Sequence, residues 1–122
     1  MNLNSVMIGS EDAKRLADYY TKLFGEPDWS DQGFAGWQLG QGSLTVGPHD
    51  EVSGSNPQPG RIMCNIETAD VPGEFERLKN AGAIVVREPY EPGGGPGMWI
   101  ATLADPDNNY FQLMSPMSSS PS

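Results

Sequence analysis

The chain has 122 residues, which is enough for one compact domain with a buried core. Its 16 acidic and 7 basic residues give a net charge of −9, and no basic patch suits nucleic acid or an anionic membrane. The lack of a long apolar run argues against a transmembrane helix, and the single cysteine, Cys64, excludes an internal disulfide and fits a cytoplasmic location.

The first half of the chain predicts one helix among short strands. Residues 3–9 predict a strand with Val6 and Ile8 on one face. Ser10 is expected to cap a helix that carries an apolar stripe and ends at Gly25. Strands are predicted around 28–30, 34–39 and 43–47, and a linker loop rich in Gly and Pro covers 48–60.

The second half repeats this order. Residues 61–67 predict a strand, Asp70 an N-cap, and Gly82 the end of the second helix. Strands are predicted over 83–87, 98–103 and 110–114, with Asn108 suited to a left-handed turn and a flexible tail over 115–122. The strand–helix–strand–strand–strand order therefore occurs twice, over about 3–47 and 61–114, and predicts a single α+β domain of two modules.

Three stretches carry a resemblance to a known family. They are Ser10-Glu11-Asp12 with the helix that ends at Gly25, Glu67–Asp70 with the helix that ends at Gly82, and Asp105-Pro106-Asp107-Asn108-Asn109. Over about residues 4–114 the chain resembles the glyoxalase / bleomycin-resistance / extradiol-dioxygenase group, also called vicinal oxygen chelate proteins. The resemblance implies two βαβββ modules that form a curved, U-shaped mixed sheet with helices outside and a concave cavity. Asn108 stands where the family usually has Gly.

The resemblance also implies where a divalent metal would bind. The family takes its ligands from the first and last strand of each module, and these positions carry Ser5, Thr45, Met63 and Gln112 here. The usual occupants are His and Glu. Two hydroxyls, a thioether and an amide suit a divalent cation poorly, so we expect no metal and no other cofactor.

The expected ligand-binding residues combine aromatic and polar side chains. They are Trp37, Met63, Asn65, Trp99, Tyr110 and Gln112. If Ala104 pairs with Asn109, Trp99 shares a sheet face with Tyr110 and Gln112. Core burial is the alternative for the tryptophans and Met63, and a bond to a neighbouring strand or to water is the alternative for Gln112. Cys64 is expected to be buried and unreactive.

These features favour a metal-free protein that binds a small, mostly apolar or aromatic molecule in its cavity. We expect it to form a homodimer and to have no nucleic-acid or membrane partner. The alternative is an enzyme of the same superfamily, of lyase, isomerase or dioxygenase type. It would be metal-dependent, or metal-free with Glu67 or His49 as acid or base. A third possibility is a partner-binding module with a filled cavity.

Overall fold

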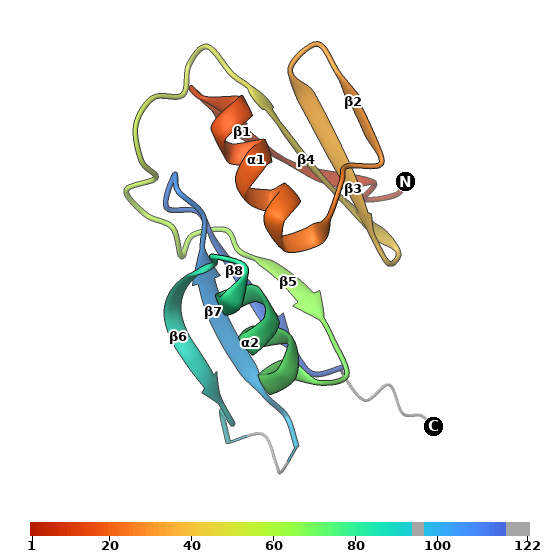
Figure 1. Cartoon of the computed structure of the whole chain (residues 1–122), viewed down its shortest axis with the longest axis vertical. Coiled ribbons are helices and arrows are strands. Elements are labelled where there is room, and N and C mark those ends of the chain that lie inside the picture. The colour runs from red at the N-terminus through yellow and green to blue at the C-terminus, as the bar shows by residue number, and fades with distance from the viewer. Residues whose placement is uncertain (94–96, 117–122) are drawn as a thin grey trace. The chain divides into compact units, whose positions relative to one another are not determined.

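The computed structural model describes residues 1–93 and 97–116, and the chain divides into two compact units (Figure 1). The first unit holds Met1–Asn56 together with Asp105–Asp107, and the second holds Pro57–Ala104 and the chain from Asn108. Each unit contains one four-stranded sheet and one helix. None of the helices in these described ranges is long and apolar enough to span a bilayer.

The first sheet has the strand order β1-β4-β3-β2. Its strands are β1 (Ser5–Ser10), β2 (Trp29–Asp31), β3 (Phe34–Leu39) and β4 (Gly42–Pro48), and only the β1–β4 pair is parallel. Gln32 and Gly33 join β2 to β3, with φ of 51° and 89°. Two consecutive positive φ values are typical of a type I′ hairpin, whose twist matches that of the strands.

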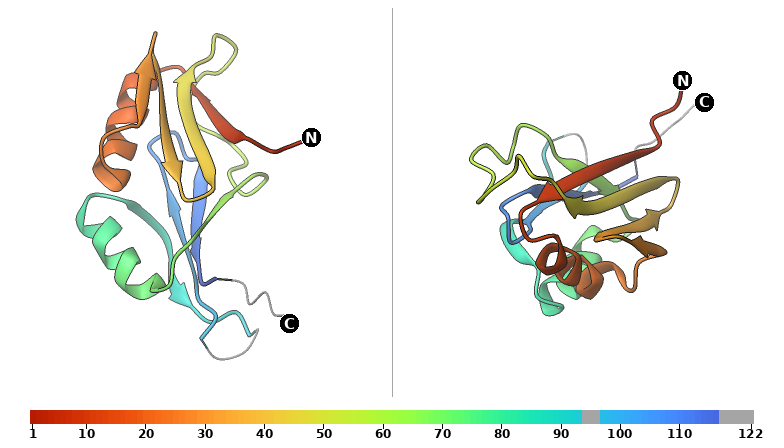
Figure 2. Two further views of the ribbon diagram at one scale, coloured as in Figure 1. Left: turned by 90° about the vertical axis from the view of Figure 1, so that its right-hand side faces the viewer. Right: turned by 90° about the horizontal axis from the view of Figure 1, so that it is seen from above.

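Helix α1 (Ala13–Phe24) covers one face of this sheet (Figure 2). Leu16, Tyr20 and Leu23 of the helix are buried, as are Trp37, Leu44 and Val46 of the sheet. The N-cap is Asp12, whose carboxylate accepts a hydrogen bond from the Arg15 amide at 3.1 Å. The prediction that Ser10 caps this helix was therefore wrong, because Ser10 is the last residue of β1.

The second sheet repeats the same topology as β5-β8-β7-β6. It consists of β5 (Cys64–Glu67), β6 (Ile84–Tyr90), β7 (Ile100–Ala104) and β8 (Tyr110–Met114), with β5 parallel to β8. Helix α2 (Val71–Asn80) covers one face and buries Val71, Phe75 and Leu78. Asp70 is its N-cap, as predicted, and accepts a hydrogen bond from the Gly73 amide at 3.1 Å.

Three features of the second module differ from the sequence prediction. Strand β5 starts at Cys64 rather than at residue 61, and Ile62, which therefore lies before the strand, is 74% exposed. Ala104 pairs with Tyr110 rather than with Asn109. Ser115 is buried and bonds Trp99 in both directions, so the ordered chain extends past the predicted start of the tail. Residues 117–122 of that tail lie outside the described residues.

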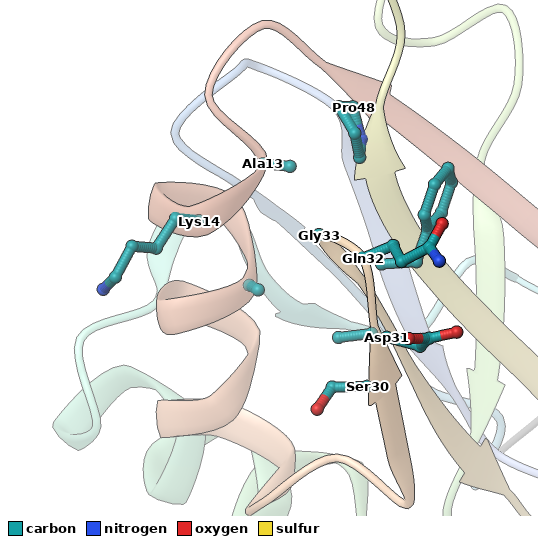
Figure 3. Close-up of a pocket in the computed structure, with 10 residues that line it drawn as sticks. Ala13, Lys14, Ser30, Asp31, Gln32, Gly33 and Pro48 are labelled. Carbon is teal, nitrogen blue, oxygen red and sulfur yellow. The ribbon is translucent and has the colours of Figure 1, made fainter.

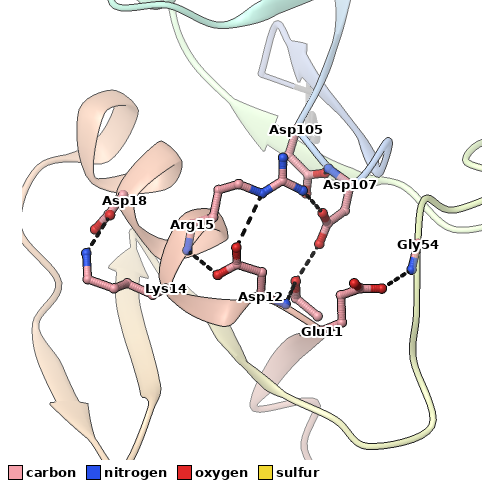
Figure 4. A network of polar contacts seen from close by, with 9 residues as sticks. Glu11, Asp12, Lys14, Arg15, Asp18, Gly54, Asp105 and Asp107 are labelled. Carbon is pink, nitrogen blue, oxygen red and sulfur yellow. Dashed lines mark hydrogen bonds and ion pairs between the residues drawn. The ribbon is translucent and has the colours of Figure 1, made fainter.

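Side chains of the turn after β7, Asp105–Asp107, form hydrogen bonds with α1 and β1, and all of these residues belong to the first unit (Figure 4). Ser10 donates to one carboxylate oxygen of Asp107 at 2.6 Å, and Arg15 donates to the other at 2.7 Å. The Tyr20 hydroxyl donates to Asp105 at 2.7 Å. Asn108 follows with a φ of 66°, which confirms its predicted left-handed conformation. The Asp-Pro-Asp motif thus provides buried acceptors for the start of α1.

Candidate functional site

Each sheet has one face covered by its helix and one face without a helix, which we call the open face. In the second sheet the helix-covered face carries Ala101, Leu103, Phe111 and Leu113, each at most 3% exposed. Side chains alternate along a strand, so the residues between these point to the open face. The site described below lies on that open face.

A row of polar side chains crosses the open face of the second sheet. Asn65 on β5 lies opposite Gln112 on β8, Gln112 opposite Thr102 on β7, and Thr102 opposite Arg87 on β6, where the register of β6 shifts on each side of Arg87. Residues paired in this way point to the same face of a sheet. Four strands therefore each contribute one hydrogen-bonding side chain to a single line, which we call the polar row.

The polar row is partly fixed by an internal hydrogen bond. The Gln112 amide nitrogen donates to the Thr102 hydroxyl oxygen at 3.1 Å. Among the described residues no other group bonds the Gln112 side chain, so its carbonyl oxygen is available to accept. A buried or half-buried amide requires partners for its remaining groups, and a bound molecule can supply one. This geometry makes Gln112 an oriented acceptor.

Apolar and aromatic side chains border the polar row on both sides. The neighbouring row contains Met114, Ile100 and Tyr90, which lie opposite one another on β8, β7 and β6. On the other side lies Tyr110, opposite Ala104. The Arg87 guanidinium lies over the Tyr90 ring, 3.4 Å from its centroid. A mostly apolar surface with a few oriented polar groups is typical of small-molecule sites.

Three of the predicted ligand-binding residues, Asn65, Tyr110 and Gln112, share this open face. Met63 precedes β5 and is 37% exposed. Trp99 precedes β7, and both its amide and its carbonyl bond Ser115. The conditional prediction that Trp99 shares a face with Gln112 was wrong, because the observed pairing of Ala104 with Tyr110 shifts the register by one residue and reverses the face.

Trp37 lies in the core of the first module. It is 2% exposed, its indole nitrogen donates to the Gly25 carbonyl at 2.8 Å, and its ring centroid lies 6.2 Å from that of Tyr20. Burial of this kind is the alternative that the sequence left open for Trp37. It leaves the side chain no surface on which a ligand could stack.

The exposed tryptophan of the first module is Trp29, which the sequence analysis did not select. It is 48% exposed on the open face, and its indole lies over Gly36 on the neighbouring strand. Phe34 lies in the same way over Gly47. A signal for both was present in the sequence, because a glycine within a strand often marks the close approach of another group.

Three of the four family metal positions lie on open faces, and the fourth lies just before a strand. Ser5 and Thr45 share the open face of the first sheet, where Ser5 pairs with Ser43 and Thr45 with Met7. Gln112 lies on the open face of the second sheet, and Met63 lies just before β5. In the described ranges no three His, Cys, Asp or Glu side chains form a group that could hold a metal ion. Hydroxyl, thioether and amide groups do not fit a divalent metal site.

Three further side chains could act as a nucleophile, an acid or a base, and they lie in different parts of the fold. Cys64 is half-buried, and burial raises the pKa of its thiol. His49 follows β4, and its Nδ1 accepts a hydrogen bond from the Glu51 amide at 3.1 Å. Glu67 pairs with Met114, so its carboxylate belongs to the open face of the second sheet. Of these three groups, only Glu67 is on the same face as the polar row.

An open pocket of about 610 Å³ lies between α1 and the β2–β3 hairpin (Figure 3). Short side chains, Ala13 and Ala17, leave this space beside the helix, and the hairpin turn at Gln32 and Gly33 borders it. Lys14 is at its edge and is bonded to Asp18 at 2.9 Å. None of the predicted ligand-binding residues lines this pocket.

One family model and several solved structures of the same fold match the chain. The model of the family described as "Glyoxalase-like domain" matches residues 5–114. A glyoxalase-related enzyme from Fulvimarina pelagi has 20% identity and a TM-score of 0.73, over 99% of this chain and 95% of its own. A glyoxalase/bleomycin resistance protein/dioxygenase family enzyme from Burkholderia phytofirmans PsJN has 21% identity and a TM-score of 0.73, over 94% and 98%. The bleomycin resistance determinant encoded on transposon Tn5 has 20% identity and a TM-score of 0.73, over 96% and 99%. No curated protein matched the chain.

Proposed function

Because the chain belongs to the glyoxalase-like domain family, we propose that it binds a small, mostly apolar or aromatic molecule on the open face of its second sheet. The observation that carries this proposal is the Gln112–Thr102 hydrogen bond of 3.1 Å in the middle of that face. It holds the Gln112 amide through its nitrogen and leaves its carbonyl oxygen to accept from a ligand, and Asn65 lies opposite Gln112 on β5. These amides would orient a ligand whose body contacts Met114, Ile100 and the tyrosines.

The polar groups give the proposal its test. A panel of aromatic compounds is titrated into 15N-labelled protein, and the backbone and side-chain amide signals are followed by NMR. Compounds that bind should shift the signals of Asn65, Thr102 and Gln112 together. Binding that shifts only residues of the first module, or no binding by any compound, would overturn the proposal.

A matched pair of variants then measures the contribution of the Gln112 amide to the binding affinity. Gln112→Leu removes the amide and keeps a side chain of similar size, and we expect it to weaken binding about fivefold, which corresponds to the loss of one hydrogen bond. Gln41→Leu makes the same change in the exposed turn between β3 and β4 and should leave the affinity unchanged. Equal losses in both variants would count against a role for Gln112.

Metal-independence is part of the proposal and is supported by the donor set at the family's metal positions. The test is metal analysis of protein purified without chelator. A single tightly bound divalent ion per chain, whose removal abolishes ligand binding or turnover, would refute metal-independence. Trace metal below a tenth of the chain concentration would support it.

One observation favours a second candidate, a metal-free enzyme of the same superfamily. Glu67 is on the open face beside the polar row, where its carboxylate could move a proton of a bound substrate. In that case Glu67→Gln would retain ligand binding and lose turnover. A protein that only binds would show no conversion of the bound molecule in either form.

A further inference from the structure

We infer that the ligand of the second sheet carries an anionic group of the carboxylate type and that Arg87 recognises it. This inference rests on the proposed function and narrows its ligand class. Arg87 is the one basic residue in the four strands of this sheet, all of which lie in the described part of the chain. It stands at the end of the polar row, opposite Thr102.

An aromatic contact restricts the Arg87 side chain, but among the described residues no carboxylate neutralises its charge. Its guanidinium carbon lies 3.4 Å from the centroid of the Tyr90 ring, a cation–π contact that restricts the side chain. Within residues 1–93 and 97–116 no carboxylate forms an ion pair with it. By contrast, Arg15 and Arg77 both bond carboxylates of the chain itself.

The acidic net charge of the chain disfavours the approach of anions in general. Its net charge is −9, so a carboxylate gains from approaching it only where a cation is exposed and unpaired. A fixed guanidinium presents parallel N–H groups that match the two oxygens of a carboxylate. Arg87 is therefore the position on this face where the attraction of an anionic group to a cation exceeds its repulsion by the acidic chain.

The positions of Arg87 and Glu67 also set the orientation of the ligand on the sheet. Glu67 lies on β5 and Arg87 on β6, which are opposite edges of the sheet. Since neighbouring strands are about 4.8 Å apart, Arg87 and Gln112 are separated by about 10 Å at the backbone. An aromatic ring with a short carboxylate side chain spans that distance. Its carboxylate would lie at Arg87, away from the carboxylate of Glu67, and its ring against Met114, Ile100 and Tyr90.

The experiment compares charged and neutral probes of equal shape. The probes are 3-phenylpropanoate, its carboxamide 3-phenylpropanamide, and phenyl phosphate, each titrated by NMR into the full chain at constant ionic strength. We expect 3-phenylpropanoate to bind about tenfold more tightly than the amide, because a hydrogen-bonded ion pair is replaced by a neutral contact. Phenyl phosphate that binds more tightly than the carboxylate would overturn the choice of carboxylate.

Variants assign the charge effect to one residue. Arg87→Gln should weaken 3-phenylpropanoate about tenfold and change the amide less than twofold. Arg61→Gln removes the same charge from a loop of the same unit, where Arg61 bonds Gln58, and should change neither probe. Equal loss in the Arg61 variant would show a general charge effect and overturn the inference.

The comparison of probes in the unmodified protein keeps the inference separate from the proposed function. If the carboxylate and the amide bind equally and both shift the Gln112 signal, the proposed function stands and the inference fails. If neither probe binds, both fail. If Arg87→Gln does not fold, the tenfold difference between the two probes in the unmodified chain still decides the question.

Discussion

Replacing Asp107 with alanine tests whether the turn before β8 stabilises the first module. The Asp107 side chain is 9% exposed and accepts hydrogen bonds from Ser10 at 2.6 Å and from Arg15 at 2.7 Å. Loss of the buried bond from Ser10 to a carboxylate costs about 1.5 to 3 kcal/mol. The Arg15 side chain is 55% exposed, so its ion pair adds less than about 1 kcal/mol.

Together these losses lower the free energy of unfolding by about 3 kcal/mol, which for a chain of this size is a fall in Tm of about 10 °C. Urea and thermal unfolding, followed by circular dichroism, measure both quantities. Asp18→Ala is the matched control, since it removes an aspartate of α1 that pairs with exposed Lys14. We expect that control to change stability by less than about 0.5 kcal/mol.

A double-mutant cycle with Ser10→Ala separates the hydrogen bond from other effects of the substitutions. If the Ser10–Asp107 bond carries the effect, the double variant loses less than the sum of the two single variants, by at least about 1 kcal/mol. A loss below about 1 kcal/mol for Asp107→Ala, or additive losses in the cycle, would refute the reasoning.

Three further predictions follow from the geometry. Gly36→Ala places a methyl group where the Trp29 indole lies, so it should lower the free energy of unfolding by about 1 to 3 kcal/mol and change the tryptophan fluorescence. The control Gly42→Ala, which has open space around its methyl group, should change neither quantity. Unchanged fluorescence in the Gly36 variant would contradict the placement of Trp29. Burial raises the pKa of the Cys64 thiol, so less thiolate forms at pH 7 in the folded chain, and iodoacetamide should alkylate it more slowly than in urea; equal rates would argue that the thiol is open to solvent. Size-exclusion chromatography with light scattering should give twice the 13.2 kDa mass of the chain if it forms the predicted homodimer, and a mass of 13.2 kDa would exclude that assembly under the conditions used.

Turn and cap residues made much of the fold predictable. Asp70, Asn108 and the glycines at the helix ends determine the backbone through local chemistry, which sequence shows directly. The doubled order of elements and the family resemblance then predicted two βαβββ modules, and the sheet topology and the structural relatives confirm this. Ser10 was misassigned because two residues near the start of α1, Ser10 and Asp12, can both cap a helix, and only the end of β1 decides between them.

The candidate site was less predictable, because it depends on register. A shift of one residue between β7 and β8 decides whether Gln112 lies beside Thr102 or beside Ala101 and Leu103. The choice between Trp29 and Trp37 is similar, since both are aromatic residues of adjacent strands. Trp37 faces α1 and Trp29 faces away from it. Arg87 was missed because an isolated arginine on an edge strand has no signature until its cross-strand partner is known.

The two modules differ most where no helix covers them. Their helix-covered faces are both built from buried aliphatic and aromatic residues, as closing a core requires. Their open faces carry different chemistry. The first has small hydroxyl groups (Ser5, Ser43 and Thr45) and Gln38, with Trp29 and Phe34 lying over glycines. The second has two amides, a threonine and an arginine: Asn65, Gln112, Thr102 and Arg87. Folding does not require this difference, because either set is compatible with the same strand order. Under the proposal of a ligand on the second sheet, the hydrogen-bonded amide and the unpaired guanidinium of the polar row serve binding rather than stability. If so, Gln112→Leu and Arg87→Gln should each lower the free energy of unfolding by no more than about 1 kcal/mol, the worth of one hydrogen bond or one cation–π contact, while weakening binding.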